Sequence, residues 1–162
     1  MEKKLLGKIV YITGASKGIG RGIAREFGKA GAFVLVGYNS DLEGANETLN
    51  MIKELGGSGE ILGGNVANKD ERNHIISSIK NKFGKLDVLV NNAGFGVHGL
   101  VTETNLEKDL ELIDLNITAL HMLTKLFLKD MKKRNLGYIL NVSSIAGFLS
   151  GPLMAEYYAS KN

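Results

Sequence analysis

A tyrosine and a lysine near the end of the chain have the spacing of a proton-transfer pair. Tyr157 and Lys161 are four residues apart, so on a helix both side chains project from one face. A phenol has a pKa of about 10, and lowering it by about 2 to 3 units requires roughly 3 to 4 kcal/mol in favour of the phenolate. An ammonium group about 4 Å away supplies energy of that order at an effective dielectric constant of about 20. The pair could therefore exchange protons near neutrality, although the spacing also fits an ordinary pair on a helix surface.

A second chemical signal lies at the other end of the chain, where an apolar run leads into a turn with three glycines. Residues 9–12 have strand character and a helical pattern follows, with Gly14, Gly18 and Gly20 between them. Glycine permits left-handed dihedral angles and lets a pyrophosphate approach the backbone closely. The free N–H groups of the first helical turn then face the phosphate oxygens. The predicted ligand is a nucleotide.

Alternating strand and helix patterns predict the frame that must carry both sites. Apolar runs predict strands at residues 9–12, 32–38, 59–66, 86–91 and 138–142. Helical patterns follow after the glycine turn, over residues 40–55, after Asn68, over residues 105–134 and around Tyr157. This order predicts an α/β fold: a Rossmann-type, doubly wound parallel sheet with right-handed crossovers and helices on both faces.

Local signals add expectations about helix ends and buried faces. Ser40 with Glu43, and Asn68 with Glu71, have the spacing of capping boxes. Three apolar faces have helical spacing, and those of the third and the long helix are predicted to face inward. The faces are Ile19, Ile23, Phe27 and Ala30 in the first helix, Ile75, Ile76, Ile79 and Phe83 in the third, and Leu106, Leu110, Ile113, Ile117, Leu120 and Thr124 in the long helix.

Length and composition limit the classes of protein to consider. The 162 residues are expected to form a single domain, residues 1–162. Without cysteine the chain has no disulfide, thiolate nucleophile or zinc-finger site. No apolar run approaches the roughly 18 residues that span a bilayer, so a cytoplasmic protein is expected. The net charge is +3 and its densest cluster, Lys132-Lys133-Arg134, suits the end of a helix. Nucleic-acid binding is the weaker interpretation of that cluster.

Three motifs in the chain occur in the order seen in a known family. They are Thr13-Gly14-x-x-x-Gly18-x-Gly20, Asn91-Asn92-Ala93-Gly94, and Tyr157-x-x-x-Lys161 thirteen residues after Ser144. This pattern resembles the short-chain dehydrogenase/reductase family. The resemblance covers all residues present and about the first two-thirds of a family member, so the chain is expected to be truncated at its C-terminus. Two further strands and most of the substrate pocket would follow, and without them the fifth strand would be an unpaired apolar edge.

The resemblance implies a catalytic set of four residues: Asn116, Ser144, Tyr157 and Lys161. It implies that Ser144 binds the substrate oxygen, where a hydroxyl can stabilise a developing alkoxide, although a plain loop hydrogen bond fits that serine equally. It also implies that Asn116 holds a water linking the lysine to solvent. Because Asn116 lies close to the apolar stripe of the long helix, a satisfied core amide is the alternative.

The resemblance also implies a cofactor site and no metal site. The expected cofactor-binding residues are Gly14, Ser16, Lys17, Gly18, Ile19, Gly20, Tyr38, Asn39, Asn65, Val66, Asn92, Ala93, Gly94, Tyr157 and Lys161. Asn65 and Val66, expected at the end of the third strand, correspond to the pair that contacts adenine. His74, His98 and His121 have no ligand spacing, and His98 is a candidate for the border of the substrate pocket.

NADP(H) is favoured over NAD(H) as the cofactor. Enzymes that prefer NAD usually have an acidic residue at the end of the second strand, where it binds the ribose 2′-hydroxyl. Here that place holds Gly37-Tyr38-Asn39-Ser40, and the first carboxylate, Asp41, is expected in the next helix. Lys17 and Arg21 can supply positive charge for a 2′-phosphate. The alternative is that both cations are solvated residues at the start of a helix.

The combined expectation is an NADPH-dependent carbonyl reductase that acts on a small ketone, aldehyde or secondary alcohol. The pattern is similar to 3-oxoacyl-acyl-carrier-protein reductases and to broad-range ketoreductases, although Phe95-Gly96-Val97-His98 departs from the Ile-Thr-Arg-Asp of the acyl-carrier group. A full-length protein is expected to form a homo-oligomer, a dimer or tetramer. The alternatives are a non-catalytic dinucleotide-binding module or an inactive fragment, and, more remotely, a methyltransferase.

Overall fold

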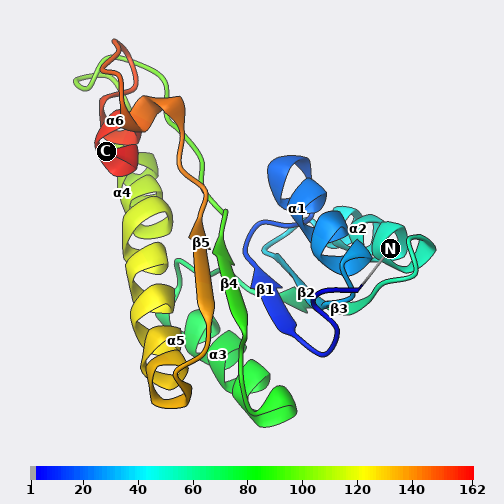
Figure 1. Ribbon diagram of the computed structural model, residues 1–162. Helices are drawn as coiled ribbons and strands as arrows, with labels where there is room; N and C mark the ends of the chain where they lie inside the picture. Colours follow the sequence, from blue (N-terminus) through cyan, green and yellow to red (C-terminus); the bar gives the residue numbers. More distant parts are fainter. Residues whose placement is uncertain (1–2) are drawn as a thin grey trace.

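Five parallel strands form one sheet in the order β3-β2-β1-β4-β5 (Figure 1). The computed structural model describes residues 3–162. The strands are β1 Ile9–Ile12, β2 Phe33–Tyr38, β3 Ser58–Gly63, β4 Val88–Asn91 and β5 Tyr138–Asn141. The chain adds β2 and β3 on one side of β1 and then returns to add β4 and β5 on the other side, which places a switch point between β1 and β4. The predicted doubly wound sheet is confirmed.

Helices cover both faces of this sheet, as Figure 1 shows. Helices α1, Gly18–Lys29, and α2, Leu42–Glu54, pack on one face. Helix α3, Lys69–Phe83, lies on the other face beside a long helix made of α4, Leu106–Ile113, a π-helical turn, Asp114–Ala119, and α5, Leu120–Arg134. A short 3₁₀ turn, Ile145–Gly147, and α6, Ala155–Lys161, follow β5. Each face of the sheet therefore has its own hydrophobic core beneath the helices, and alternate residues of the same strands contribute to the two cores.

The strand alternation explains the two cores. Val10 and Ile12 of β1 face α1 and α2, whereas Tyr11 between them faces α3 and α5. Central strands buried on both faces need apolar residues at every position, which is the pattern that predicted them. Complete burial raises the pKa of Tyr11, so this phenol stays neutral inside the sheet.

Helix α1 packs on the sheet mainly through small residues rather than through its apolar face of helical spacing. Gly20, Ala24 and Gly28 are buried, and a Cβ at Gly28 would lie 2.6 Å from Ile52 of α2. Ile19 is 67% exposed, and only Ile23 and Phe27 of the expected face pack against the core. The glycine turn brings the start of α1 so close to the sheet that larger side chains cannot fit beneath it, so Ile19 points away from the core.

The long helix buries a different stripe from the one expected. Leu106 and Leu110 are 70% and 51% exposed, and Ile113 and Ile117 are exposed as well. The buried stripe is Asp109, Leu112, Asn116, Ala119, Leu123, Phe127 and Met131. The prediction failed because this helix has two apolar stripes and the buried one contains polar residues, which lowers its apparent hydrophobicity. The π-helical turn also shifts the helical phase in the middle of the pattern.

Helix ends and strand ends follow the sequence signals more closely. Asn68 caps α3 as predicted, because its Oδ1 accepts from the N–H groups of Asp70 and Glu71. Asp41, and not Ser40, caps α2 through a 3.0 Å bond from the N–H of Gly44. Strand β3 ends at Gly63, so the expected extension of this strand to residue 66 was wrong.

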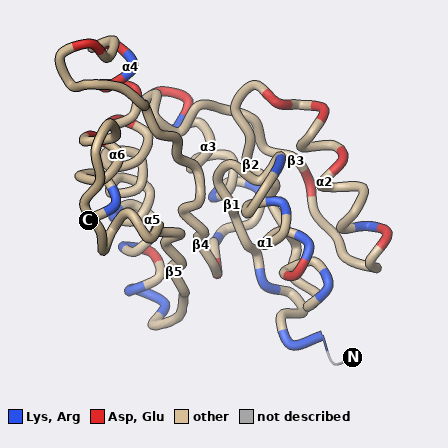
Figure 2. The backbone as a smooth tube through the Cα atoms, turned by 90° about the horizontal axis from the view of Figure 1, so that it is seen from above, with Lys and Arg blue, Asp and Glu red and all other residues tan. Residues whose placement is uncertain are grey.

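Charged residues are spread over several elements, as Figure 2 shows. The basic cluster that ends with Arg134 lies in the last turn of α5, as expected from the helix dipole. Within residues 3–162, no helix is both long enough and apolar enough to cross a membrane.

Candidate active site

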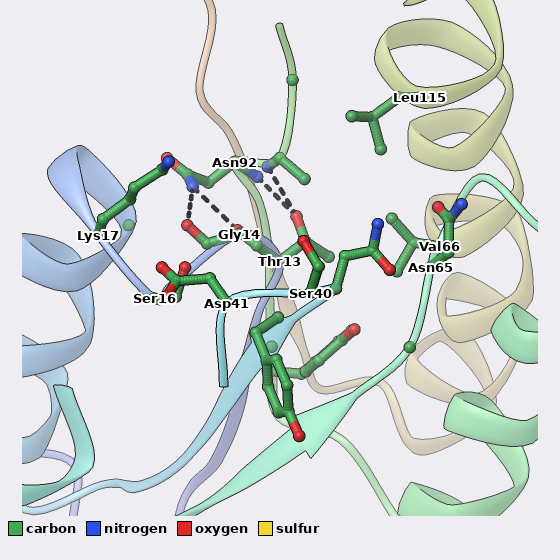
Figure 3. A pocket seen from close by; sticks show the side chains of 18 of the residues that line it. Thr13, Gly14, Ser16, Lys17, Ser40, Asp41, Asn65, Val66, Asn92 and Leu115 are labelled. Atoms are coloured by element: carbon green, nitrogen blue, oxygen red, sulfur yellow. Dashed lines mark hydrogen bonds between the residues drawn. The ribbon is translucent and has the colours of Figure 1, made fainter. Parts of the chain in front are cut away.

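A cavity of about 430 Å³ opens at the carboxyl edge of the sheet, where the loops after β1, β2, β3 and β4 meet. Figure 3 shows side chains from these loops around it. Most of the expected cofactor residues line the cavity: Gly14, Ser16, Lys17, Ile19, Gly20, Tyr38, Asn39, Asn65, Val66, Asn92, Ala93 and Gly94. Gly18, Tyr157 and Lys161 are not part of its lining. Seven further lining residues were not among those expected to bind the cofactor: Tyr11, Thr13, Gly37, Ser40, Asp41, Gly64 and Leu115.

The glycine turn leaves no room for side chains beneath the cavity. Gly14 has φ +62°, and a Cβ there would lie 3.0 Å from the Cα of Ala93. A Cβ at Gly20 would overlap the carbonyl oxygen of Gly14. Helix α1 begins here and has no side-chain cap on its first N–H groups. The floor of the cavity is thus bare backbone with N–H groups available to an anion.

Thr13 and Asn92 bind the glycine turn to the loop after β4. The Asn92 Nδ2 donates to the carbonyl oxygens of Thr13 and Gly14, each at 2.9 Å. The Thr13 Oγ1 accepts from the N–H groups of Asn92 and Ala93, also at 2.9 Å. These bonds are drawn in Figure 3. Sequence reasoning gave Thr13 no separate role, although its place directly before the first glycine was a signal.

A carboxylate lies at the rim of the cavity beside Lys17. The sequence placed Asp41 inside the next helix, but as the N-cap of α2 it lines the cavity next to Ser16 and Lys17 (Figure 3). A hydrogen bond from the Ser16 hydroxyl and one from the N–H of Gly44, helped by the nearby cations, hold the pKa of Asp41 below its usual value. Asp41 is therefore ionised at neutral pH.

Arg21 does not line the cavity. Its guanidinium donates to the carbonyl oxygens of Ser16 and Gly44 and pairs with the Glu47 carboxylate at 2.9 Å. These contacts join the glycine turn to α2. The contribution of the Arg21 charge to phosphate binding stays a prediction, since its Nε and Nη2 are bonded to Ser16 and α2.

Tyr157 and Lys161 share one face of α6, as their spacing predicted. The Lys161 Nζ lies 5.8 Å from the centroid of the Tyr157 ring. On its other side, a Cβ built on Gly94 would lie 3.4 Å from this Nζ. Since Gly94 lines the cavity, the ammonium group is positioned between the phenol and the cavity edge. The Tyr157 ring itself packs against Gly96, where a Cβ would lie 3.2 Å from Cδ2.

Asn116 links the loop after β4 to α6. The side chain is 3% exposed and lies in the π-helical turn. Its Oδ1 accepts from the N–H of Phe95, and its Nδ2 donates to the carbonyl oxygen of Phe95 and to the Ser160 Oγ, each at 2.9 to 3.1 Å. The Ser160 hydroxyl donates to the carbonyl oxygen of Tyr157 at 2.8 Å. The alternative of a satisfied core amide therefore describes the contacts of Asn116, and nothing in the sequence pointed to Ser160.

Ser144 begins the 3₁₀ turn that packs against the end of α6. Its Oγ accepts from the N–H of Ala146 at 3.2 Å, which is the plain loop bond considered from the sequence. A hydroxyl that accepts one bond can still donate its own proton to a ligand. The turn packs closely against α6 at Gly147, where a Cβ would overlap the carbonyl oxygen of Lys161. Ser144 and Tyr157 thus lie on neighbouring segments after β5.

The histidines form no metal site within the described residues. Among residues 3–162, no three His, Cys, Asp or Glu side chains are grouped as metal ligands. The His74 Nε2 lies 3.5 Å from the Ser78 Oγ on the same helix.

Residues 8–162 match the family model of the short chain dehydrogenases. The chain belongs to the short-chain dehydrogenase family. It is 40% identical to glucose 1-dehydrogenase 2 of Bacillus subtilis over 99% of this chain and 63% of that protein. It is 37% identical to a 3-oxoacyl-[acyl-carrier-protein] reductase of Synechocystis over 97% of this chain and 64% of that protein. The chain thus spans slightly less than two-thirds of the length of these curated relatives.

Solved structures of short-chain dehydrogenases share this arrangement. A metagenomic short-chain oxidoreductase in complex with NADP superposes with a TM-score of 0.93 at 33% identity, covering 98% of this chain and 72% of that one. A putative gluconate 5-dehydrogenase from Beutenbergia cavernae, with NADP bound at low occupancy, has a TM-score of 0.89 at 32% identity and covers 99% and 64%. The fold and the family are therefore established together.

Proposed function

We propose that the protein is an NADPH-dependent oxidoreductase that interconverts a small ketone or aldehyde and a secondary or primary alcohol. The observation that carries this proposal is the position of Lys161, whose ammonium group lies between the Tyr157 ring and Gly94 at the cavity edge. Family membership and the NADP-bound relatives support it.

The residues around the cavity suit a dinucleotide. The volume of about 430 Å³ falls within the usual range for ligand pockets. Gly14 and Gly20 leave a cradle that any Cβ would fill, and the uncapped N-terminus of α1 offers N–H groups to a pyrophosphate. Asn65 and Val66 would contact the adenine, and Asn92, Ala93 and Gly94 would line the path toward the nicotinamide.

In this mechanism, Tyr157 donates a proton to the substrate oxygen or takes it back from the alcohol. The Lys161 ammonium group would stabilise the negative charge that forms on the phenol oxygen as Tyr157 gives up its proton. Ser144 would donate a hydrogen bond to the oxygen as negative charge develops on it. Asn116 would keep α6 in place, and the proposed water between the lysine and solvent would lie near it. When bound, the dinucleotide supplies or accepts the hydride.

We propose NADP(H) rather than NAD(H), on the basis of Lys17 at the cavity rim. Asp41 beside it opposes a 2′-phosphate, so the preference should be moderate. We further propose that residues 1–162 act as one domain in a cytoplasmic homo-oligomer. The 3-oxoacyl-acyl-carrier-protein reductases and sugar dehydrogenases among the relatives make a ketone or polyol the first substrates to test.

The test combines the protein with NADPH and a panel of small ketones, including a 3-oxoacyl thioester. Loss of the nicotinamide absorbance band with any substrate supports the proposal. Binding of NADPH without absorbance loss would favour the non-catalytic module instead. Binding of S-adenosylmethionine in place of NADPH would favour a methyltransferase.

A further inference from the structure

One wall of the cavity is held from behind by a buried arginine. Arg72, in the first turns of α3, is 4% exposed. Its Nη1 donates to the carbonyl oxygens of Val66 at 2.7 Å and Ala67 at 3.1 Å. Among residues 3–162, no carboxylate forms an ion pair with Arg72. Burying a guanidinium costs free energy, and hydrogen bonds from its N–H groups offset part of that cost.

Other groups at the start of α3 hold the same segment. The Glu71 Oε2 accepts from the N–H of Asn65 at 2.8 Å, and the N–H of Asn68 donates to the carbonyl oxygen of Asn65 at 3.0 Å. The Asn65 Oδ1 in turn accepts from the N–H of Ala67 at 3.0 Å. The N–H and C=O groups of Asn65 and Ala67 and the C=O of Val66 are thus bonded, and Arg72 supplies the bonds to the carbonyl groups of Val66 and Ala67.

Val66 connects this arrangement to the cavity. Its side chain is buried in the core beneath α3, and it also lines the cavity beside Asn65 (Figure 3). Arg72 itself does not line the cavity. The hydrogen bonds that join Arg72 to the cavity wall are those to the carbonyl groups of Val66 and Ala67.

We propose that Arg72 is a positioning residue for the adenine end of the cofactor site. It holds the carbonyl groups of Val66 and Ala67 so that Asn65 and Val66 present a fixed surface to the adenine ring. This inference rests on the proposed function, which assigns adenine contact to Asn65 and Val66. A disturbance at Arg72 should weaken the adenosine half of the ligand and leave the nicotinamide half unchanged.

The experiment measures competition against NADPH bound to the protein, followed by nicotinamide fluorescence. Adenosine 5′-monophosphate reports the adenine end, and nicotinamide mononucleotide reports the other end. In Arg72→Met, which keeps the length and apolar stem but removes the donors, we expect the inhibition constant of adenosine monophosphate to rise about tenfold. That of nicotinamide mononucleotide should change less than about twofold. Arg72→Lys keeps the charge without the planar fork and should show a partial loss of about threefold.

Arg134 offers a control at the amino ends of the strands, where it also pairs with the Asp87 carboxylate at 3.6 Å. Its Nη2 donates to the carbonyl oxygen of Leu86 at 2.6 Å, and its Nε, like that of Arg72, is buried without a partner. Leu86 precedes β4, at the amino ends of the strands, whereas the cavity lies at their carboxyl ends. Arg134→Met should therefore lower stability without changing either inhibition constant.

Three outcomes would overturn the inference. Equal losses for both competitors in Arg72→Met would mean general loosening, and no loss would mean that Arg72 only packs α3. If Arg72→Met does not fold, Arg72→Lys decides alone, and an unchanged adenosine monophosphate constant in it counts against the proposal. A wild-type protein that binds no NADPH would instead refute the proposed function, which this assay detects before any variant is measured.

Discussion

The two halves of this molecule are built in different ways. Around β1, β2 and β3, the cavity floor is backbone, and its shape depends on glycines and on bonds from Asn92 to the carbonyl groups of Thr13 and Gly14. Around β4, β5 and α6, the site depends on side-chain bonds between distant residues, such as Asn116 with Phe95 and Ser160. The nucleotide half therefore depends on close backbone approaches, whereas the catalytic half depends on packed side chains.

The largest expected effect separates chemistry from binding. Tyr157→Phe removes the hydroxyl that transfers the proton, so ketone turnover should fall by about a thousandfold, within the usual range for a lost acid or base. The dissociation constant for NADPH should change little, because Tyr157 does not line the cavity. Steady-state kinetics and a binding titration on a catalytically active form of the protein provide the measurement.

Tyr158→Phe is the matched control for this prediction. Tyr158 lies on the same helix but packs toward Gly151, and the residue four positions on is Asn162 rather than a lysine. Its loss should leave turnover within about threefold of wild type. Undiminished turnover in Tyr157→Phe would contradict the proposed mechanism.

The second effect tests the backbone cradle of the nucleotide half. A Cβ at Gly20 would overlap the carbonyl oxygen of Gly14, so Gly20→Ala must displace the turn. NADPH affinity should fall by at least about thirtyfold, measured by fluorescence titration. Gly22→Ala, two residues along the same helix, meets nothing within 4 Å and should retain affinity while gaining about 0.5 to 1 kcal/mol of stability. Similar affinities in the two variants would contradict the cradle.

The third effect sharpens the contrast between the halves. Asn116→Ala leaves the Phe95 N–H and C=O without their partners and releases Ser160, so unfolding free energy should fall by about 2 to 4 kcal/mol. Hydrogen exchange should quicken in α6 and residues 94–97 before it quickens in α1. Ser160→Ala, which removes the bond from Asn116 and the bond to the carbonyl oxygen of Tyr157, should lose less, about 1 to 2 kcal/mol. Uniform exchange across both halves would mean that they are not held independently.

The smallest effect concerns cofactor choice at the cavity rim. Asp41→Asn removes the charge beside Lys17 but keeps an oxygen that can accept from the N–H of Gly44. The ratio of NADP to NAD affinity should rise about three- to fivefold. Lys17→Met should move the ratio the opposite way. Parallel binding titrations with both dinucleotides measure it, and a fall in the ratio in Asp41→Asn would refute the repulsion argument.

The sequence predicted more of the nucleotide half than of the catalytic half. The glycine turn and the cap at Asn68 are short-range patterns, and both occur where they were expected. The long helix was predicted with correct ends but the wrong buried face, because its inward stripe contains Asp109 and Asn116. Asn116 turns inward to bond with Phe95, and that requirement cannot be read from helical spacing.

The sequence by itself determined where the chemical motifs lie along the chain: a glycine turn after the first strand, an asparagine pair after the fourth, and a tyrosine and lysine one helical turn apart. Such patterns are local because glycine dihedral angles and helical periodicity involve only neighbouring residues. Only the tertiary structure decided that Asp41 faces the cavity, that Arg21 does not, and that Lys161 lies against Gly94. These are contacts between residues far apart in the chain, and their formation depends on how the helices pack on the sheet.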